Sequence, residues 1–342
     1  MTAQAAPSAA GSDGAKVVSF FEKTKFSEKK TLTSRPIMRN VNLSVATIGV
    51  FDGVHQGHRF LLDRVRDLAS VRGMRALAVT FDPTPAAFFQ NAPSPSPSLL
   101  LTIEERKERL LDAGMDRVEV MAFNREVAEM TAAEFVMLLK ERHDVRVLVM
   151  GYDHRFGCEQ SNDPAFYDAA CQTCGIETVH ATAWGDVSSS RIRELLLNGN
   201  TRGATVLLGY PYPIGGTVVA GDGRGRTIGF PTANLAVDAS KLIPATGVYA
   251  VGVRLEGNTY RGMMNIGLCP TFGGRTERRV EVHILDFDAD IYGQTLDVQL
   301  LHRLRDERKF PSAEALAEQL HADAARIRTL PDFNSSWLFP HY

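Results

Sequence analysis

Three features that would each define a class of protein are missing from this 342-residue sequence. No apolar run approaches the roughly 18 residues needed to cross a bilayer, so we expect no transmembrane helix. The four cysteines are too few for a disulfide scaffold and suit a reducing compartment, so we expect a cytoplasmic protein. The net charge is only −2, which predicts no general affinity for nucleic acid or anionic membranes. An anionic ligand would therefore have to be bound by local donors.

The first 40 residues are rich in alanine and serine and contain no apolar segment typical of a secretory signal. Acidic residues (Asp13, Glu22 and Glu28) and the scarcity of arginine before Arg35 also disfavour a mitochondrial presequence. We therefore interpret residues 1–40 as an N-terminal extension that is partly disordered. The remaining length is enough for two domains.

The most informative segment is Gly49–His58, a turn with three glycines and two histidines. An apolar, β-branched segment precedes it and helical spacing of apolar residues begins near Gly57, so we expect strand, turn and helix in that order. Such a turn aims backbone N–H groups and the positive end of the helix at an anion. His55 and His58 would lie on one face of the first helical turn. A surface loop with two ordinary histidines is the plainer alternative, and the spacing fits neither GxGxxG nor a P-loop.

Strands and helices alternate through the first half of the chain. The alternation predicts βαβ units and a doubly wound parallel sheet, in which ligands bind beyond the carboxyl ends of the strands. The expected strands are residues 43–48, 74–81, 117–123, 145–150 and 177–180, and the expected helices include 102–112, 131–141 and 164–174.

Three further segments can converge on the same crevice. Asp82-Pro83 and Gly151–Gly157 each follow an expected strand, as the Gly49 turn does. Val187–Arg193 places hydroxyls and two arginines at a helix start, which predicts an anion site by the same logic. A simple N-cap cluster at Ser188–Ser190 is the alternative.

Cys171-x-x-Cys174 invites a zinc or redox interpretation, but no second pair of ligands follows at a suitable spacing. Both thiols fall on an expected helix that ends at Gly175. We therefore interpret them as helix packing, with a metal site as the alternative.

Beyond Gly199 the sequence changes to short β-branched segments separated by glycines, which predicts a small antiparallel barrel. Ser312 would then cap an amphipathic terminal helix. The expected strands are residues 216–219, 247–254, 259–266, 279–286 and 294–304.

Two features of this second half carry chemistry. The basic loop Gly221–Gly229 can wrap phosphates, and Thr232 and Asn234 supply neutral oxygens suited to Mg²⁺ shared with phosphate. A β-turn with surface arginines is the alternative. Alternation along the later strand puts Glu281 and His283 on one face. A pair of solvated side chains without a role is the alternative.

These segments resemble the bifunctional bacterial riboflavin kinase/FAD synthetase family. Gly49–His58 is similar to its GxFDGxHxGH signature, in which two imidazoles contact the triphosphate of ATP during adenylyl transfer. The TFDPHP, GxDFRFG and ISSTxIR segments of the family resemble Thr80–Pro85, Gly151–Gly157 and Val187–Arg193, with Thr84, His154 and Ser190 replacing its histidine, phenylalanine and threonine. The kinase motifs GRxxGFPTAN, PxxGVYA, NIGxxPTF and EVHxLDF recur in order in the second half.

The resemblance implies a role for each of a set of residues. Catalytic roles fall to His55, His58 and Glu281; ATP or phosphate contacts to Gly49, Phe51, Asp52, Gly53, Gly57, Ser189, Ser190, Arg193, Gly223, Arg224 and Arg226; flavin contacts to Asp82, Pro83, Pro85, Asp153 and Arg155; and Mg²⁺ ligation to Thr232 and Asn234. It also implies an FMN adenylyltransferase domain at residues 41–203, a riboflavin kinase domain at 204–330 and a tail at 331–342.

The implied reactions are phosphorylation of riboflavin to FMN and adenylylation of FMN to FAD, with ATP as co-substrate and Mg²⁺ as cofactor. Three alternatives stay open. The first is a monofunctional FMN adenylyltransferase whose barrel only binds flavin, and the second is a non-catalytic flavin-sensing regulator. The third is another HxGH transferase, such as a cytidylyltransferase, which would leave the second domain unexplained. The oligomeric state is left unknown.

Overall fold

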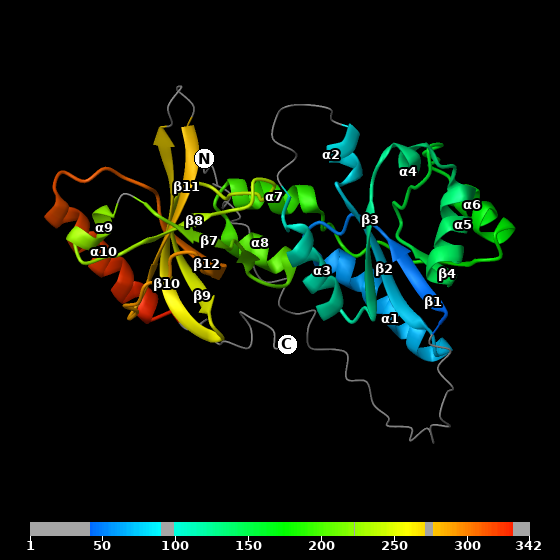
Figure 1. The fold of residues 1–342 in the computed structure, drawn as a ribbon, viewed down its shortest axis with the longest axis horizontal. Coiled ribbons are helices and arrows are strands. Elements are labelled where there is room, and N and C mark those ends of the chain that lie inside the picture. Colours follow the sequence, from blue (N-terminus) through cyan, green and yellow to red (C-terminus); the bar gives the residue numbers. More distant parts are fainter. Residues whose placement is uncertain (1–41, 90–98, 222, 271–275, 331–342) are drawn as a thin grey trace, which may run out of the picture. The chain divides into compact units, whose positions relative to one another are not determined.

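The computed structural model describes residues 42–89, 99–221, 223–270 and 276–330, all within the compact unit Arg39–Tyr342. The N-terminal extension and the tail expected at residues 331–342 lie outside the described residues. Figure 1 shows the element order.

The first half of the described chain contains a fully parallel five-stranded sheet in the order β3-β2-β1-β4-β5. The expected doubly wound sheet is confirmed. Its strands are β1 Ser44–Ile48, β2 Arg75–Asp82, β3 Arg117–Ala122, β4 Val145–Met150 and β5 Glu177–His180. Because the order reverses between β1 and β4, the loops that leave these two strands open on the switch point of the sheet.

Helices cover both faces of this sheet. Val45, Ala78 and Val149 pack toward α1 and α3, whereas Ala46, Val79 and Leu148 pack toward α5 and α6. Successive strand residues therefore point to opposite faces, as the period of two requires. The helices are α1 Gln56–Arg72, α2 Pro85–Phe89, α3 Ile103–Asp112, α4 Arg125–Glu129, α5 Ala132–His143, α6 Pro164–Thr173, α7 Ser189–Leu197 and α8 Thr201–Leu208.

Local sequence signals set several of these helix starts. Thr102 and Thr131 each form a capping box, with Glu105 and Glu134 respectively returning a hydrogen bond to the cap. Gly73 takes a left-handed conformation and ends α1.

The second half forms an antiparallel barrel, as expected. Its described strands follow the order β12-β7-β8-β11-β10-β9, and pairing of β12 with β9 closes the ring, while short β6 adds to β12. The strands are β6 Tyr212–Pro213, β7 Gly216–Val219, β8 Ala233–Ala236, β9 Gly247–Leu255, β10 Asn258–Pro270, β11 Thr276–Ile284 and β12 Thr295–Arg305, with α9 Arg224–Thr227 and α10 Ala313–Arg328. The expected strands omitted β8, which overlaps the end of the motif Phe230–Leu235. Ser312 caps α10 as predicted.

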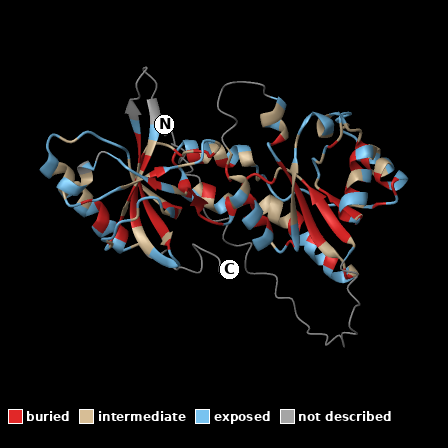
Figure 2. Ribbon diagram, in the orientation of Figure 1, coloured by how far each residue is buried: buried red, intermediate tan, exposed pale blue. Residues whose placement is uncertain are grey.

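One core cluster joins the two halves. Ile192 and Leu196 of α7 and Ala204 and Leu208 of α8 are buried in the same cluster as Val251 and other interior residues of the barrel. Figure 2 shows buried residues concentrated along the strands of both sheets. The helices α7 and α8 therefore bury apolar surface against the barrel.

Cys171 lies on α6 and Cys174 is its C-cap, and both are buried in the core cluster that α6 shares with α5. Burial raises the pKa of the Cys171 thiol to about 12, so the thiol stays protonated. The helix-packing interpretation of this pair is confirmed. No helix among the described residues is long and apolar enough to span a membrane.

Candidate active sites

The turn that follows β1 is held in an unusual backbone conformation. Phe51 and Val54 have positive φ angles of 50° and 33°, and Gly53 has a φ of 88°. Gly49 donates its N–H to Val79 of the neighbouring strand at 3.0 Å, and the Phe51 ring packs against it. Non-glycine residues at positive φ are strained, so the surrounding contacts must hold this turn in place.

His55 caps the helix that begins directly after this turn. Its Nδ1 accepts a hydrogen bond from the backbone N–H of His58 at 3.3 Å, so a neutral His55 carries its proton on Nε2. The two imidazoles stack with ring centroids 3.7 Å apart. A Cβ on Gly57 would lie 3.3 Å from the His55 ring, which explains the glycine between the histidines.

Both imidazoles are held neutral. Burial lowers the pKa of His55 from 6.5 to about 4, against the opposing effect of Asp52. Burial also lowers the pKa of His58 well below 6.5, and the nearby His55, His154 and Arg106 lower it further. Among the described side chains, Nδ1 of His58 is buried without a hydrogen-bond partner. Neutral rings can donate to phosphate oxygens without acting as acids at pH 7.

The carboxylate of Asp52 anchors the turn and does not face solvent. It accepts the N–H groups of Leu100 at 2.9 Å and Leu101 at 3.1 Å and pairs with Arg193 at 2.5 Å. The residue is only 3% exposed. Its contacts therefore join the turn to the start of α3 and to α7.

The start of α7 lies beside the same turn. Ser188 is the N-cap, and its hydroxyl accepts the N–H of Arg191 at 3.3 Å. The Ser189 hydroxyl donates to the main-chain carbonyl of Asp52 at 2.7 Å. The N-cap and the contact with the turn thus use different hydroxyls, and Ser188, Ser189 and Ser190 all line the adjoining pocket.

A pocket of about 1040 Å³ opens at the switch point between β1 and β4. It gathers most of the residues that sequence patterns marked for the adenylyl reaction: Gly49, Phe51, Asp52, His55, Gly57, His58, Pro85, Asp153, Arg155, Ser189, Ser190 and Arg193. Gly53, Asp82 and Pro83 are not among its lining residues.

The exit from β2 flanks the pocket. Asp82 and Pro83 are joined by a cis peptide bond and are exposed. Thr84, which stands where the family pattern has histidine, is buried and its hydroxyl accepts the N–H of Ala87 at 3.3 Å. Thr84 therefore stabilises the start of α2, whose Pro85 lines the pocket.

The loop after β4 contributes the opposite wall. Asp153 and Arg155 are exposed and line the pocket, and His154 lies between them. Burial lowers the pKa of His154 to about 4, against the opposing effect of Asp153. His154 is therefore a third neutral imidazole at this site, where the family pattern has phenylalanine.

Two residues of this site were not selected from the sequence. Arg106 of α3 is fully buried, donates to Thr80 Oγ1 and the Phe81 carbonyl at 3.3 and 3.1 Å, and lowers the pKa of His58. Trp184 lines the pocket, is 49% exposed and stacks on Phe60 with centroids 5.0 Å apart. Arg106 occupies an ordinary helical position, so no local pattern in the sequence distinguishes it. Trp184 is one of only two tryptophans and stands shortly before the serines, and this position could have marked it as a site residue.

The barrel brings its glycine loop against Thr232 and Asn234. A Cβ on Gly221 would collide with the Asn234 amide, and one on Gly225 would collide with the Phe230 carbonyl and lie 3.4 Å from Thr232 Oγ1. Gly223 adopts a φ of 67° at the start of the short helix α9. The side chain of Arg224 lies outside the described part of the chain. The loop can therefore approach these two oxygens because glycine stands at positions 221 and 225.

Glu281 lies directly opposite Asn234 in the β11–β8 pairing and opposite Asn265 in the β11–β10 pairing. Arg279 lies 3.7 Å from its carboxylate. His283 lies on the same face, with Nδ1 2.8 Å from the Pro231 carbonyl, and burial lowers its pKa. Antiparallel neighbours of this kind share a face, so Glu281 and Asn234 point the same way.

A second pocket of about 380 Å³ lies on the other face of β11, because Val282 and Ile284 line it and alternate along the strand with Glu281 and His283. Arg226, Thr232, Asp288 and Tyr292 are among the residues that line it. Glu281 and Asn234 are not among its lining residues. Within the described residues, no group of three or more His, Cys, Asp and Glu side chains is placed to bind a metal. A cation here would therefore rely on neutral side-chain oxygens and on phosphate.

The described chain combines a parallel sheet that has a pocket at its switch point with an antiparallel barrel that has a pocket of its own. A family model described as FAD synthetase matches residues 38–193, and one described as riboflavin kinase matches residues 208–330. The chain belongs to the bifunctional riboflavin kinase/FMN adenylyltransferase family.

Relatives carrying that name are similar over most of their length. The chain is 36% identical to the one from Listeria monocytogenes over 287 residues, covering 83% of this chain and 91% of the relative. It is 38% identical to the one from Pseudomonas fluorescens over 292 residues, covering 84% and 92%. A crystal structure of a protein named a macrolide-efflux protein from Streptococcus pneumoniae has a TM-score of 0.77 and 33% identity, covering 86% of this chain and 96% of that one.

Proposed function

We propose that this chain makes both flavin nucleotides from riboflavin. It transfers a phosphoryl group from ATP to riboflavin, giving FMN and ADP, and then an adenylyl group from a second ATP to FMN, giving FAD and pyrophosphate. The presence of both family domains, each with its own pocket, carries this proposal. We assign the second reaction to residues 41–203 and the first to residues 204–330, in a cytoplasmic protein.

For adenylyl transfer, the phosphate of FMN is already an anionic nucleophile and needs no general base. It needs alignment with the α-phosphate of ATP and stabilisation of the charge that develops on pyrophosphate. Neutral His55 and His58 would donate to the triphosphate, and Ser190 at the start of α7 would add a further donor. Asp52 and Arg193 would hold the turn in register, which their mutual contact supports.

The flavin and the adenine would use the remaining walls of the same pocket. Asp153 and Arg155 supply charged groups on the loop after β4, and Pro85 lies across from them. Phe123 and Trp184 add aromatic surface suited to stacking on a flat ring. Asp82 and Pro83 would contribute by setting the backbone path that leads into α2.

For phosphoryl transfer, a neutral ribityl hydroxyl attacks the γ-phosphate, so a general base helps. Glu281 is our candidate for that base, which its position opposite Asn234 supports. Thr232 and Asn234 would hold Mg²⁺ jointly with the phosphates, beneath Gly223, Arg224 and Arg226 of the glycine loop. The bound cation would neutralise charge on the phosphates.

The test is to incubate the purified full-length protein with riboflavin, ATP and MgCl₂ and to separate the flavins by chromatography. We expect FMN to appear first and FAD to follow. If the protein makes FAD from added FMN but makes no FMN from riboflavin, only the adenylyl-transfer activity of residues 41–203 is supported. Absence of both nucleotides would refute the proposal.

A further inference from the structure

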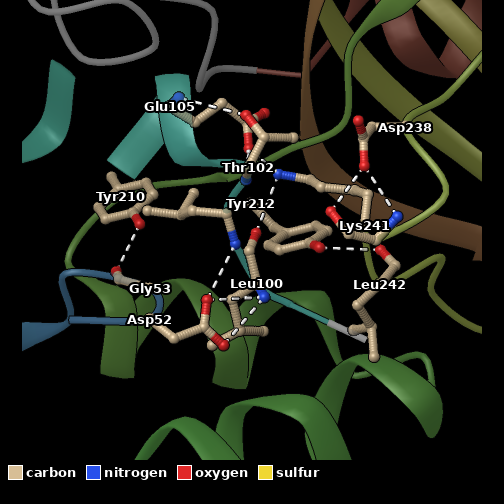
Figure 3. A network of polar contacts seen from close by, with 12 residues as sticks. Asp52, Gly53, Leu100, Thr102, Glu105, Tyr210, Tyr212, Asp238, Lys241 and Leu242 are labelled. Carbon is tan, nitrogen blue, oxygen red and sulfur yellow. Dashed lines mark hydrogen bonds and ion pairs between the residues drawn. The ribbon is translucent and has the colours of Figure 1, made fainter. Parts of the chain in front are cut away.

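Lys241 lies in the segment matched by the riboflavin kinase model, yet its side chain contacts residues matched by the FAD synthetase model. The residue is only 5% exposed. Its ammonium donates to the Leu100 carbonyl at 2.9 Å and pairs with Glu105, and it lies 4.9 Å from the centre of the Tyr212 ring. Figure 3 shows these contacts on the opposite side of Leu100 from Asp52.

The two charges hold opposite ends of one peptide unit. The carbonyl of Leu100 and the N–H of Leu101 belong to the same planar trans peptide, so they point in opposite directions. Lys241 binds the carbonyl end at 2.9 Å, and Asp52 binds the N–H end at 3.1 Å. Rotation of this peptide would break both contacts together.

Main-chain contacts keep Lys241 in register with that peptide. The N–H of Leu99 donates to the Ser240 carbonyl at 2.7 Å, and the N–H of Leu242 donates to the Leu99 carbonyl at 2.8 Å. Leu99 and Lys241 form an isolated parallel bridge. These backbone contacts therefore fix the position of Lys241 relative to the Leu100–Leu101 peptide.

Stability alone is a poor explanation for this buried charge. Burial lowers the pKa of Lys241, and the Glu105 carboxylate opposes that effect. Because desolvation offsets most of the attraction in a buried pair, apolar residues of the same volume often stabilise a fold equally well. A lysine here differs from an apolar residue in fixing the direction of the Leu100 carbonyl.

Asp52 and Gly53 both contact Leu100 or its peptide, and both belong to the turn after β1. Asp52 pairs with Arg193 at 2.5 Å, and the Tyr210 hydroxyl donates to the Gly53 carbonyl at 2.5 Å. A Cβ on Gly53 would lie 2.8 Å from the Leu100 side chain. A change in the Leu100–Leu101 peptide would therefore move the turn that carries His55 and His58.

We propose that Lys241 is a positioning residue for adenylyl transfer to FMN, acting through the Leu100–Leu101 peptide on Asp52 and the turn after β1. The inference rests on the proposed function. It means that the site at the parallel sheet is completed by a residue from the other family domain. Lys241 lines neither of the two pockets described above.

The test uses full-length Lys241→Met combined with Glu105→Gln, so that no buried carboxylate is left unpaired. Gln at position 105 can still accept the N–H of Thr102 that closes the capping box. Glu105→Gln alone is the matched control, because it leaves the bond from Lys241 to the Leu100 carbonyl. Lys241→Gln is a second variant, with a shorter neutral donor, for the case in which the double variant does not fold.

We expect kcat for FAD formation to fall about a hundredfold in the double variant, because a shift of about 1 Å in the groups that position the reacting atoms lowers the rate by about that factor. Riboflavin phosphorylation should match that of Glu105→Gln, and the thermal unfolding midpoint should be no lower than in that control, because the double variant leaves no buried charge unpaired. Lys241→Gln should lose part of the FAD-forming kcat. FAD formation at the control rate in a folded Lys241 variant would overturn the inference. An equal loss of both activities would also overturn it. Failure of the unmodified protein to make FAD would instead refute the proposed function.

Discussion

Arg193 and Asp52 are 141 positions apart in the chain, and Arg193 Nη2 lies 2.5 Å from Asp52 Oδ2. The pair joins the turn after β1 to helix α7. Because the same carboxylate accepts the Leu100 and Leu101 N–H groups, one side chain holds three distant segments together.

Asp52→Asn should destabilise the protein by about 3 kcal/mol, because the buried carboxylate that pairs with the half-buried Arg193 and accepts two main-chain N–H groups loses its charge. FAD formation should be lost in the folded fraction, while riboflavin phosphorylation remains. Urea unfolding followed by fluorescence measures the first effect. Asp63→Asn, which breaks an exposed pair with Arg66, is the control and should change stability by less than about 0.5 kcal/mol. Equal effects of the two substitutions would contradict the anchoring role of Asp52.

His58→Ala and Glu281→Ala should separate the two reactions. His58→Ala should lower kcat for FAD formation about 10²–10³-fold and spare FMN formation, because it removes a donor to developing phosphate charge. Glu281→Ala should slow riboflavin phosphorylation about 10²–10⁴-fold and still make FAD from added FMN. Steady-state rates for each half reaction measure both effects.

His180→Ala is a histidine control for that experiment. His180 is partly exposed, pairs with Asp168 at 2.9 Å and does not line the large pocket among the described residues. Its substitution should leave FAD formation unchanged. If His58→Ala behaves like His180→Ala, the assignment of the first turn is wrong.

Gly221→Ala should abolish riboflavin phosphorylation, because its Cβ would overlap the Asn234 amide and displace the oxygen assigned to Mg²⁺. FAD formation from FMN should persist. Gly257→Ala is the comparison, since its φ of 80° is strained but nothing lies within 4 Å of the added carbon. Radiolabel transfer from [γ-³²P]ATP to riboflavin reports the activity, and normal transfer by Gly221→Ala would argue against the phosphate site.

Stability should fall as the solution is acidified below pH 6.5, in part because of His55. Its pKa of about 4 in the folded protein lies below 6.5, so the unfolded chain binds the proton more readily in this window. This one group should remove about 2 kcal/mol between pH 7 and pH 5. At pH values above 6.5 it should contribute nothing.

His55→Asn isolates that contribution. Asparagine can accept the His58 N–H as an N-cap but does not titrate. The variant should therefore lose less unfolding free energy than the unmodified protein when urea titrations at pH 7 and pH 5 are compared. Identical losses would show that His55 is not neutral in the folded state.

Local sequence determined the elements and many of their ends. Short apolar, β-branched segments specified most strands of both sheets, and Thr102, Thr131 and Ser312 specified helix starts through hydrogen bonds that span only three residues. The spacing of glycines and histidines in Gly49–His58 likewise indicated a phosphate-binding turn, because backbone approach and helix direction are local properties.

Tertiary structure alone decided which distant groups meet. Closure of the barrel by β12 and β9, the shared core of α7, α8 and the barrel, and the burial of Arg106 depend on long-range packing. The contact of Lys241 with the Leu100 carbonyl joins residues 141 positions apart. The pattern of residues in a short segment cannot predict such a long-range contact. The free energy that stabilises the contact comes from removing both segments from water and from hydrogen bonds between their polar groups.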